Sequence, residues 1–195
     1  EEDFEGFAHT FVWLSLNREC EWLQTLFGEE RLELEDGLHG SLIAIELDDK
    51  HQFTLLCRDL SEIANYATVD NVQFKQLKAH TPAPITFILN ATKDVPKKLA
   101  HPKKKTIGIR VPSNPIAQAL LAAMDEPILT SSLILPHRDE ILDDPFEIEE
   151  LLGNQIDGLI NAGIKTTKLT TIVDMTTNQP EIIRQGAADV SSLVP

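Results

Sequence analysis

The segment Thr106–Pro136 constrains the fold more than any other part of the chain, and its sequence is TIGIRVPSNPIAQALLAAMDEPILTSSLILP. This pattern predicts a strand, a turn, a helix and a second strand. In the first strand, Thr106–Val111, a two-residue period puts both isoleucines and Val111 on one face and Gly108 and Arg110 on the other. Gly108 has no side chain, so we expect open space beside Arg110. An arginine there could receive an anion, especially a phosphate, because its planar guanidinium donates several hydrogen bonds at once.

Strands and helices alternate along the rest of the chain from His51 onward. The predicted strands are Gln52–Cys57, Ile85–Leu89, Ile128–Leu133, Gly158–Asn161, Thr171–Met175 and Glu181–Arg184. The predicted helices are Glu62–Tyr66 after a Ser61 cap, Asn71–His80, one that Asn114 caps and Pro127 ends, and one from Asp144 to about Leu152. The short connection Met175–Pro180 is close to a hairpin, so part of the sheet is antiparallel. The sequence therefore predicts an α/β (α+β) domain with a mixed sheet.

The net charge of −14 is concentrated in the first part of the chain. Residues 1–49 hold 14 acidic and 2 basic residues, whereas residues 50–195 hold 17 acidic and 15 basic residues. This shift predicts an acidic N-terminal segment, 1–49, with a short helix over Glu19–Phe27 and a strand over Ser41–Leu47. The second predicted domain is 50–195. The acidic segment should repel nucleic acid and anionic membranes.

Several common kinds of site are missing from the sequence. It has no GxxxxGK[ST], GxGxxG or GxSxG motif, and its histidines form no helical ligand pair. The acidic run Asp139–Asp144 is typical of a solvated loop, so we expect no metal site. Cys20 and Cys57 are too few for a disulfide framework, and no apolar run is long enough to span a membrane. These features favour a cytoplasmic protein with reduced thiols.

Hydroxyl groups and arginines are found near the predicted strand ends. Arg110 and Ser113 flank a turn, Thr130–Ser132 follow one another on the next strand, Thr171 begins a strand and Arg184 ends one. Ligands of open α/β sheets bind outside strand ends, so these groups would suit a nucleotide phosphate or a small amino acid. The alternative interpretation is that they reflect ordinary strand propensity.

A basic run lies just before Arg110. Its lysines are Lys93, Lys97, Lys98, Lys103, Lys104 and Lys105, opposed only by Asp94. Lysines supply most non-specific nucleic-acid affinity through phosphate contacts. No aromatic residue lies among them, which favours backbone recognition of a duplex over base stacking. The alternative is a solvated loop that keeps an edge strand from aggregating.

Five sequence blocks resemble the YrdC/YciO-like family, the YciO branch in particular. They are HQFTLLCRDLSE, ITFILNATKDVPKKL, KKTIGIRVPSNPIAQALL, EPILTSSLILP and TTIVDMT, and they occur in order over about residues 50–195. The resemblance implies a twisted mixed sheet flanked by helices, with a positively charged concave face. Members of the family include threonylcarbamoyl-AMP synthases, which use ATP, bicarbonate and threonine in tRNA modification. Other members are described as binding double-stranded RNA.

The same resemblance implies nucleotide-binding roles for particular residues. Arg110 matches the arginine of the RVP turn, Ser132 the serine after the central strand, and Thr171 a hydroxyl that meets the nucleotide. Arg184, in IIRQG, matches an arginine near the phosphates. Lys50 lies near the end of the expected position of the family's basic motif. We expect RNA contacts from Lys97, Lys98, Lys103, Lys104 and Lys105.

Two features of the synthases are absent from this sequence. Residues 1–49 contain neither the PTDT-like segment nor the lysine–x–arginine motif, and Ile134 stands where an asparagine is usual. The sequence thus predicts a protein that binds nucleotide or double-stranded RNA phosphates, with no catalytic residue assigned. The alternatives are an active synthase that uses ATP with Mg²⁺, in which Lys50 and Arg58 replace the missing motif, and an interaction protein whose acidic segment binds a basic partner.

Overall fold

The structure, a computed structural model, describes residues 54–95, 100–101, 103–135, 138, 140–153, 159–161, 168–177 and 179–193. These residues belong to two compact units, and each is considered separately. The sheet unit comprises the described parts of 50–127 and 168–195, and the smaller unit comprises those of 128–167. The separation of the chain into an N-terminal segment and a domain at residues 49 and 50 stays a prediction.

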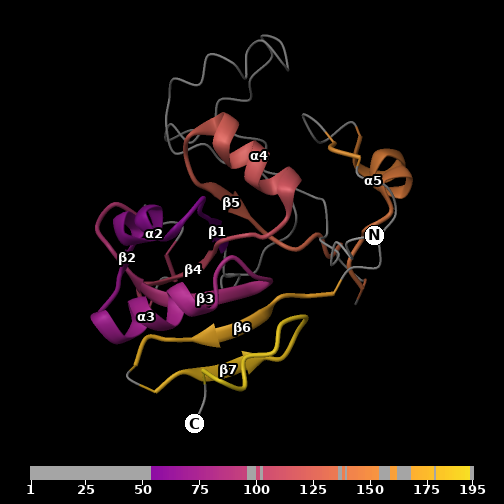
Figure 1. Cartoon of the computed structure of the whole chain (residues 1–195). Coiled ribbons are helices and arrows are strands. Elements are labelled where there is room, and N and C mark those ends of the chain that lie inside the picture. Colours follow the sequence, from indigo (N-terminus) through magenta and orange to yellow (C-terminus); the bar gives the residue numbers. More distant parts are fainter. Residues whose placement is uncertain are drawn as a thin grey trace. The chain divides into compact units, whose positions relative to one another are not determined.

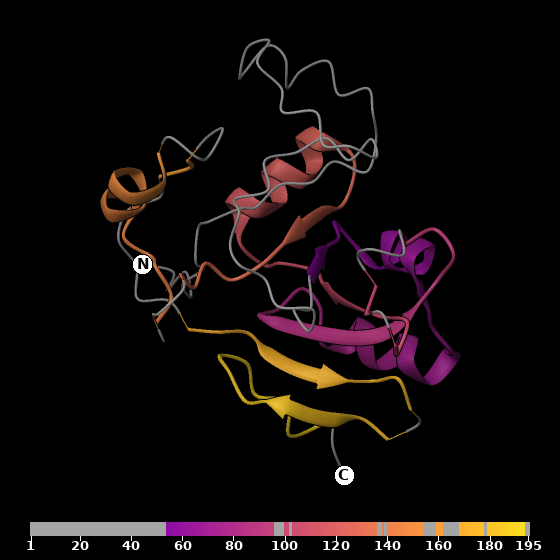
Figure 2. The same cartoon turned by 180° about the vertical axis from the view of Figure 1, so that it is seen from behind.

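The sheet unit contains a mixed β-sheet with the strand order β1-β4-β3-β6-β7 (Figure 1). Its strands are β1 (Thr54–Leu56), β3 (Ile85–Ala91), β4 (Thr106–Arg110), β6 (Thr171–Asp174) and β7 (Glu181–Arg184), with the short β2 (Ala67–Thr68) paired to β3. The β1–β4 and β3–β6 pairs are parallel, and the β3–β4 and β6–β7 pairs are antiparallel. Figure 2 shows β6 and β7 side by side with opposite directions. The predicted mixed sheet is therefore confirmed.

Side-chain caps define where the helices of this unit begin. Helix α2 (Leu60–Tyr66) is capped by Asp59, whose carboxylate accepts hydrogen bonds from the next amides. The prediction of Ser61 as the cap was wrong, because Ser61 already lies inside the helix. Helix α3 (Asn71–Ala79) begins with a complete capping box at Asp70. Helix α4 (Pro115–Met124) has Asn114 as its cap and proline at its first position, as predicted.

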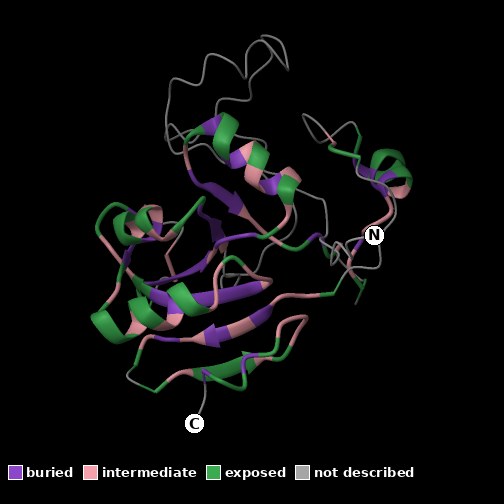
Figure 3. Ribbon diagram, in the orientation of Figure 1, coloured by how far each residue is buried: buried purple, intermediate pink, exposed green. Residues whose placement is uncertain are grey.

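Both faces of the central strands are covered. Ile107, Ile109 and Phe87 share one face and have relative exposures of 2% or less. On the other face, Thr106 and Gly108 are also buried. Figure 3 shows β3 and β4 mostly buried and β7 mostly exposed. The open space that we expected beside Arg110 stays a prediction.

The smaller unit contains β5 (Ile128–Thr130) and α5 (Pro145–Leu152). Asp144 caps α5, as predicted. An apolar cluster holds the unit together, and its buried members are Leu133, Leu142, Ile148 and Leu152. The Leu142 amide donates to the Leu133 carbonyl at 2.9 Å, which fixes the loop between β5 and α5.

Some predicted elements differ from the observed ones. β5 ends at Thr130 rather than Leu133, and residues 159–161 form no strand. β2 was not predicted, because two residues are too few to show a period. The elements expected within residues 1–53 lie outside the described residues. In the part of the chain that the structure describes, no helix combines the length and the hydrophobicity needed to cross a bilayer.

Thr171 anchors the segment that follows β7. Its hydroxyl donates to the Ala188 carbonyl at 2.7 Å and accepts from the amides of Gly186 and Ala188 at 3.0 and 3.1 Å. Gly186 is required there, because a Cβ would overlap the backbone of Leu169 and Thr170. Thr171 is fully buried, so these hydrogen bonds form away from water.

We therefore expect Thr171→Val to lower the free energy of unfolding by about 1–3 kcal/mol, because it leaves buried backbone groups without their partner. Urea denaturation measures the effect. The control is Thr177→Val, an exposed position in the next turn, where the change should stay within about 0.5 kcal/mol. Equal effects of the two variants would contradict an anchoring role for Thr171.

Candidate phosphate-binding site

Arg110 ends β4 at one end of the sheet. The Leu56–Arg110 pair is the last of the β1–β4 ladder, and the Cys57 amide donates to the Arg110 carbonyl at 2.8 Å. The residue is partly exposed, but the Nε and Nη2 atoms of its guanidinium are buried. Burial lowers the pKa of Arg110 to about 9, because the charged form loses solvation. At neutral pH it is still a cation, now in a low-dielectric environment.

The strand register places Arg184 on the same face of the sheet as Arg110. Phe87 pairs with Ile109, so the next residues, Thr86 and Arg110, both point to the opposite face. Thr86 in turn pairs with Ile172, and Ile172 pairs with Arg184. Residues that are directly opposite in a ladder share a face. The two arginines therefore lie in one row across four strands.

Hydrogen bonds between side chains connect part of this row. Thr86 Oγ1 and Thr170 Oγ1 are 3.1 Å apart, and Arg184 Nη2 donates to Thr170 Oγ1 at 3.3 Å. Arg184 also donates from Nε and Nη2 to the Thr170 carbonyl, at 3.2 and 3.0 Å. We call Arg110, Thr86, Thr170 and Arg184 the arginine row. The sequence analysis missed Thr86, because its own strand is almost entirely apolar and only the register reveals its neighbours.

The two arginines have different environments within the row. Arg184 is half-buried and donates to Thr170, so it ties the end of β7 to the start of β6. Burial lowers the pKa of Arg184 as well. Three strand spacings of about 4.8 Å separate it from Arg110, which gives roughly 14 Å between their backbones. A single phosphate does not span this distance between side chains held in place, whereas an extended nucleotide reaches along it.

Three further residues, Ser132, Thr171 and Lys50, are predicted to bind the nucleotide. The Thr171 hydroxyl belongs to the anchor described above, where it makes one donated and two accepted hydrogen bonds. Ser132 is exposed, two residues beyond β5 in the smaller unit, and its carbonyl accepts from the Ile134 amide. Lys50 lies outside the described residues. Their roles toward a nucleotide stay predictions.

The described lysines of the basic run lie at the opposite end of β4. Lys103, Lys104 and Lys105 are exposed in the turn that leads into the strand. His101 stabilises this turn, because its Nδ1 accepts from the amides of Lys103 and Lys104 at 3.2 Å each. About five residues of strand, or roughly 17 Å, separate Lys105 from Arg110. Lys97 and Lys98 lie outside the described residues, so the structure separates Arg110 from every predicted RNA-binding lysine that it describes.

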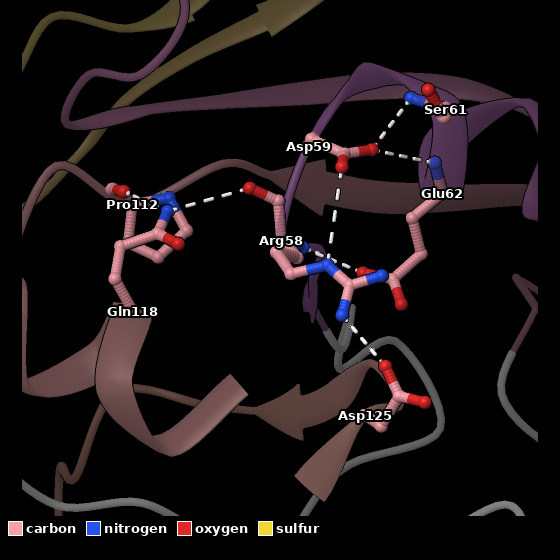
Figure 4. Close-up of polar contacts among 7 residues, drawn as sticks. All are labelled: Arg58, Asp59, Ser61, Glu62, Pro112, Gln118 and Asp125. Atoms are coloured by element: carbon pink, nitrogen blue, oxygen red, sulfur yellow. Dashed lines mark hydrogen bonds and ion pairs between the residues drawn. The ribbon is translucent and has the colours of Figure 1, made fainter. Parts of the chain in front are cut away.

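Acidic groups surround Arg58, the residue that was considered as a substitute for the missing basic motif (Figure 4). Its Nη1 is 2.7 Å from Asp125 Oδ1, and its Nε is 3.9 Å from Asp59 Oδ2. The hydrogen bond to Asp125 raises the pKa of Arg58. The Arg58 charge is thus largely offset by carboxylates of its own protein.

The titratable groups nearby do not form a catalytic set. Burial raises the pKa of the Cys57 thiol, and the carboxylates of Glu62 and Asp59 raise it further, so this thiol is a poor nucleophile. Burial also raises the pKa of Glu62. Among the described residues, no group of histidine, cysteine and acidic side chains could hold a metal ion.

The sequence and the fold both match known proteins. Residues 42–186 match the Sua5_yciO_yrdC family, which carries the description "Telomere recombination". The chain belongs to this family. It is 51% identical to the uncharacterized protein YciO of Escherichia coli K12 over 145 residues, which cover 74% of this chain and 70% of YciO. The crystal structure of E. coli YciO superimposes with a TM-score of 0.72, over 76% of this chain and 72% of that one.

More distant relatives carry functional names. A putative threonylcarbamoyl-AMP synthase of Methanocaldococcus jannaschii is 28% identical over 174 residues, 87% of this chain and 79% of that protein. P. abyssi Sua5, crystallised with L-threonine, shares the fold with a TM-score of 0.67 at 18% identity, over 74% of this chain and 42% of Sua5. The fold inferred from the sequence resemblance is confirmed by these matches.

The two arginines of the row should respond differently to replacement by methionine. The lowered pKa of Arg110 means that its charged form is less favourable in the folded state than in the unfolded state. At pH 7 Arg110 is charged in both states, so burial of this charge lowers the free energy of unfolding. We expect Arg110→Met to leave the free energy of unfolding unchanged or to raise it by about 1–2 kcal/mol. Arg184→Met removes the hydrogen bonds to Thr170 and should lower it by about 1–2 kcal/mol. Urea denaturation at pH 7 compares the two, and a loss of stability in Arg110→Met similar to that in Arg184→Met would contradict this assignment.

Proposed function

We propose that this chain binds the phosphate groups of a nucleotide, ATP, along the arginine row. The observation that carries the proposal is a buried cation, Arg110, that shares a face and a register row with Arg184. Arg110 is the main phosphate ligand in this proposal, and Arg184 positions the strand edge toward which the nucleotide extends.

The physical reason is the environment of Arg110. A guanidinium that has lost solvation gains more from an anion than one in water, because the effective dielectric constant around it is low. Its planar fork matches two phosphate oxygens at once. A bound phosphate would therefore supply the solvation that burial removes.

On the resemblance of their sequence blocks, within a family domain that spans 50–195, we also propose Ser132, Thr171 and Lys50 as nucleotide ligands. For Thr171 this requires a change of hydrogen-bond partners, since its hydroxyl is engaged with the backbone. Mg²⁺ would accompany ATP if the site is catalytic.

ATP binding should depend strongly on Arg110. We expect Arg110→Met to weaken ATP binding at least tenfold, because a hydrogen-bonded charge pair contributes about 1.5–3 kcal/mol. Isothermal titration calorimetry measures the affinity, with and without threonine. Arg138→Met is the matched control, since Arg138 is an exposed arginine of the smaller unit with Glu147 as its partner at 2.6 Å. Equal affinities of the Arg110→Met variant and the unmodified chain would contradict the proposal.

A second candidate function is threonylcarbamoyl-AMP synthesis from ATP, bicarbonate and threonine. The name of the M. jannaschii relative and the L-threonine in the Sua5 crystal favour it. The acidic partners of Arg58 make it a poor replacement for the missing basic motif, because a guanidinium that is paired with carboxylates attracts a phosphate less strongly. Threonine that increases ATP affinity and triggers pyrophosphate release would establish the synthase over simple nucleotide binding. No pyrophosphate from any combination of the three substrates would exclude it.

We further propose that the lysine turn, Lys103–Lys105, binds the phosphate backbone of double-stranded RNA, together with Lys97 and Lys98. Its support is the exposure of three consecutive lysines at the end of the β3–β4 hairpin, away from the arginine row. This separation makes RNA binding and ATP binding independent, so each proposal has its own test.

Replacing all three lysines of the turn by glutamine should lower the dependence of duplex RNA affinity on salt. If each lysine meets one phosphate, the slope of log K against log salt becomes smaller by about 2 to 3. Fluorescence anisotropy at several salt concentrations measures it. The matched control replaces Lys75, Lys78 and Lys168, which are also exposed. Duplex affinity that is unaffected by salt, or an equal loss in both triple variants, would refute RNA binding at this turn.

A further inference from the structure

Gln118 connects the two chain segments that leave the sheet beside Arg110. It lies in the second turn of α4, and its Nε2 donates to the Pro112 carbonyl at 2.7 Å and to the Arg58 carbonyl at 3.4 Å (Figure 4). Pro112 is two residues beyond Arg110, and Arg58 is two residues beyond Leu56, the partner of Arg110 in the ladder. The Gln118 carboxamide thus links the segments that follow β4 and β1.

The carboxamide of Gln118 suits this position. Both neighbours are carbonyl oxygens, and the NH₂ group of glutamine has two N–H bonds to offer. The opposite orientation of the amide would bring Oε1 against two acceptors, so the hydrogen-bond pattern fixes which way it points. The shorter of the two hydrogen bonds is the one to the Pro112 carbonyl, at 2.7 Å.

The same helix face carries a second contact to Arg58. Asp125 is the C-cap of α4, seven residues after Gln118, and seven residues are close to two helical turns. Its carboxylate holds the Arg58 side chain at 2.7 Å, while Gln118 holds the Arg58 carbonyl. Both contacts set α4 against the end of β1. The ion pair between Arg58 and Asp125 is largely exposed, so it contributes little to stability. The Gln118 carboxamide also contacts Pro112, in the turn after Arg110.

We propose that Gln118 is a positioning residue for the phosphate site: it holds the Val111–Asn114 turn so that Arg110 keeps the orientation in which it receives a phosphate. This inference rests on the proposed ATP binding at the arginine row. Gln118 acts through Pro112 and does not touch the nucleotide. The turn has a further backbone contact that reports on its position, because the Ala83 amide donates to the Val111 carbonyl at 3.1 Å.

The test uses the full chain with Gln118→Met, which keeps the length and helix propensity of the side chain and removes both donors. We expect ATP affinity to fall about tenfold, since a misplaced binding group loses much of its effect. The midpoint of thermal unfolding should shift by less than about 4 °C, because Gln118 is not in the core. The matched control is Gln179→Met, at an exposed position between β6 and β7, and its ATP affinity should be unchanged.

Hydrogen exchange gives a readout that does not depend on ATP. In Gln118→Met the Ala83 amide should exchange faster, while the Ala91 amide, which donates to the Lys105 carbonyl at the far end of β4, should exchange at its normal rate. An unchanged Ala83 rate would overturn the inference even if ATP does not bind. Faster Ala83 exchange with undiminished ATP affinity in Gln118→Met would also overturn the inference about Gln118. If Arg110→Met loses ATP binding and Gln118→Met does not, the proposed function stands and only the role of Gln118 is rejected.

Discussion

The pairing of β4 with β1 on one side and with β3 on the other is the constraint on which the rest of the sheet unit depends. Once Ile109 is opposite Phe87, the two-residue period of the strands leaves one face for Arg110 and the other for the isoleucines. A shift of one residue would place the guanidinium among the buried side chains of the core face. The apolar face therefore fixes the register, and the register fixes where the charge lies.

The alternation of apolar residues predicted most of this arrangement. Ile107 and Ile109 share the core face as expected, and Asn114 and Asp144 cap their helices, because these signals need only neighbouring residues. The cap of α2 is Asp59 and not Ser61. Both residue types are favourable at this position, so the sequence does not distinguish them and the backbone geometry is needed. The Thr86–Thr170–Arg184 connection could not be predicted, because its members come from three strands and meet only through the ladder.

The positively charged residues that the sequence analysis singled out make different contacts in the fold. Arg184 gives its donors to Thr170, and Arg58 gives its charge to Asp125, so both have structural partners. The lysines of the turn are exposed. Burial works against the charges of both Arg184 and Arg110, and it lowers the pKa of Arg110 to about 9. A residue that costs stability in its own fold is a stronger candidate for function than one that the fold requires.

The contacts that shape the sheet around Arg110 come from the sheet unit itself. The sheet needs the register of β4, the threonine anchor at Thr171 and the turn after Arg110, and all of these lie within the sheet unit. Arg110, the proposed phosphate ligand, and the described residues that hold its strand and the following turn are therefore parts of one unit.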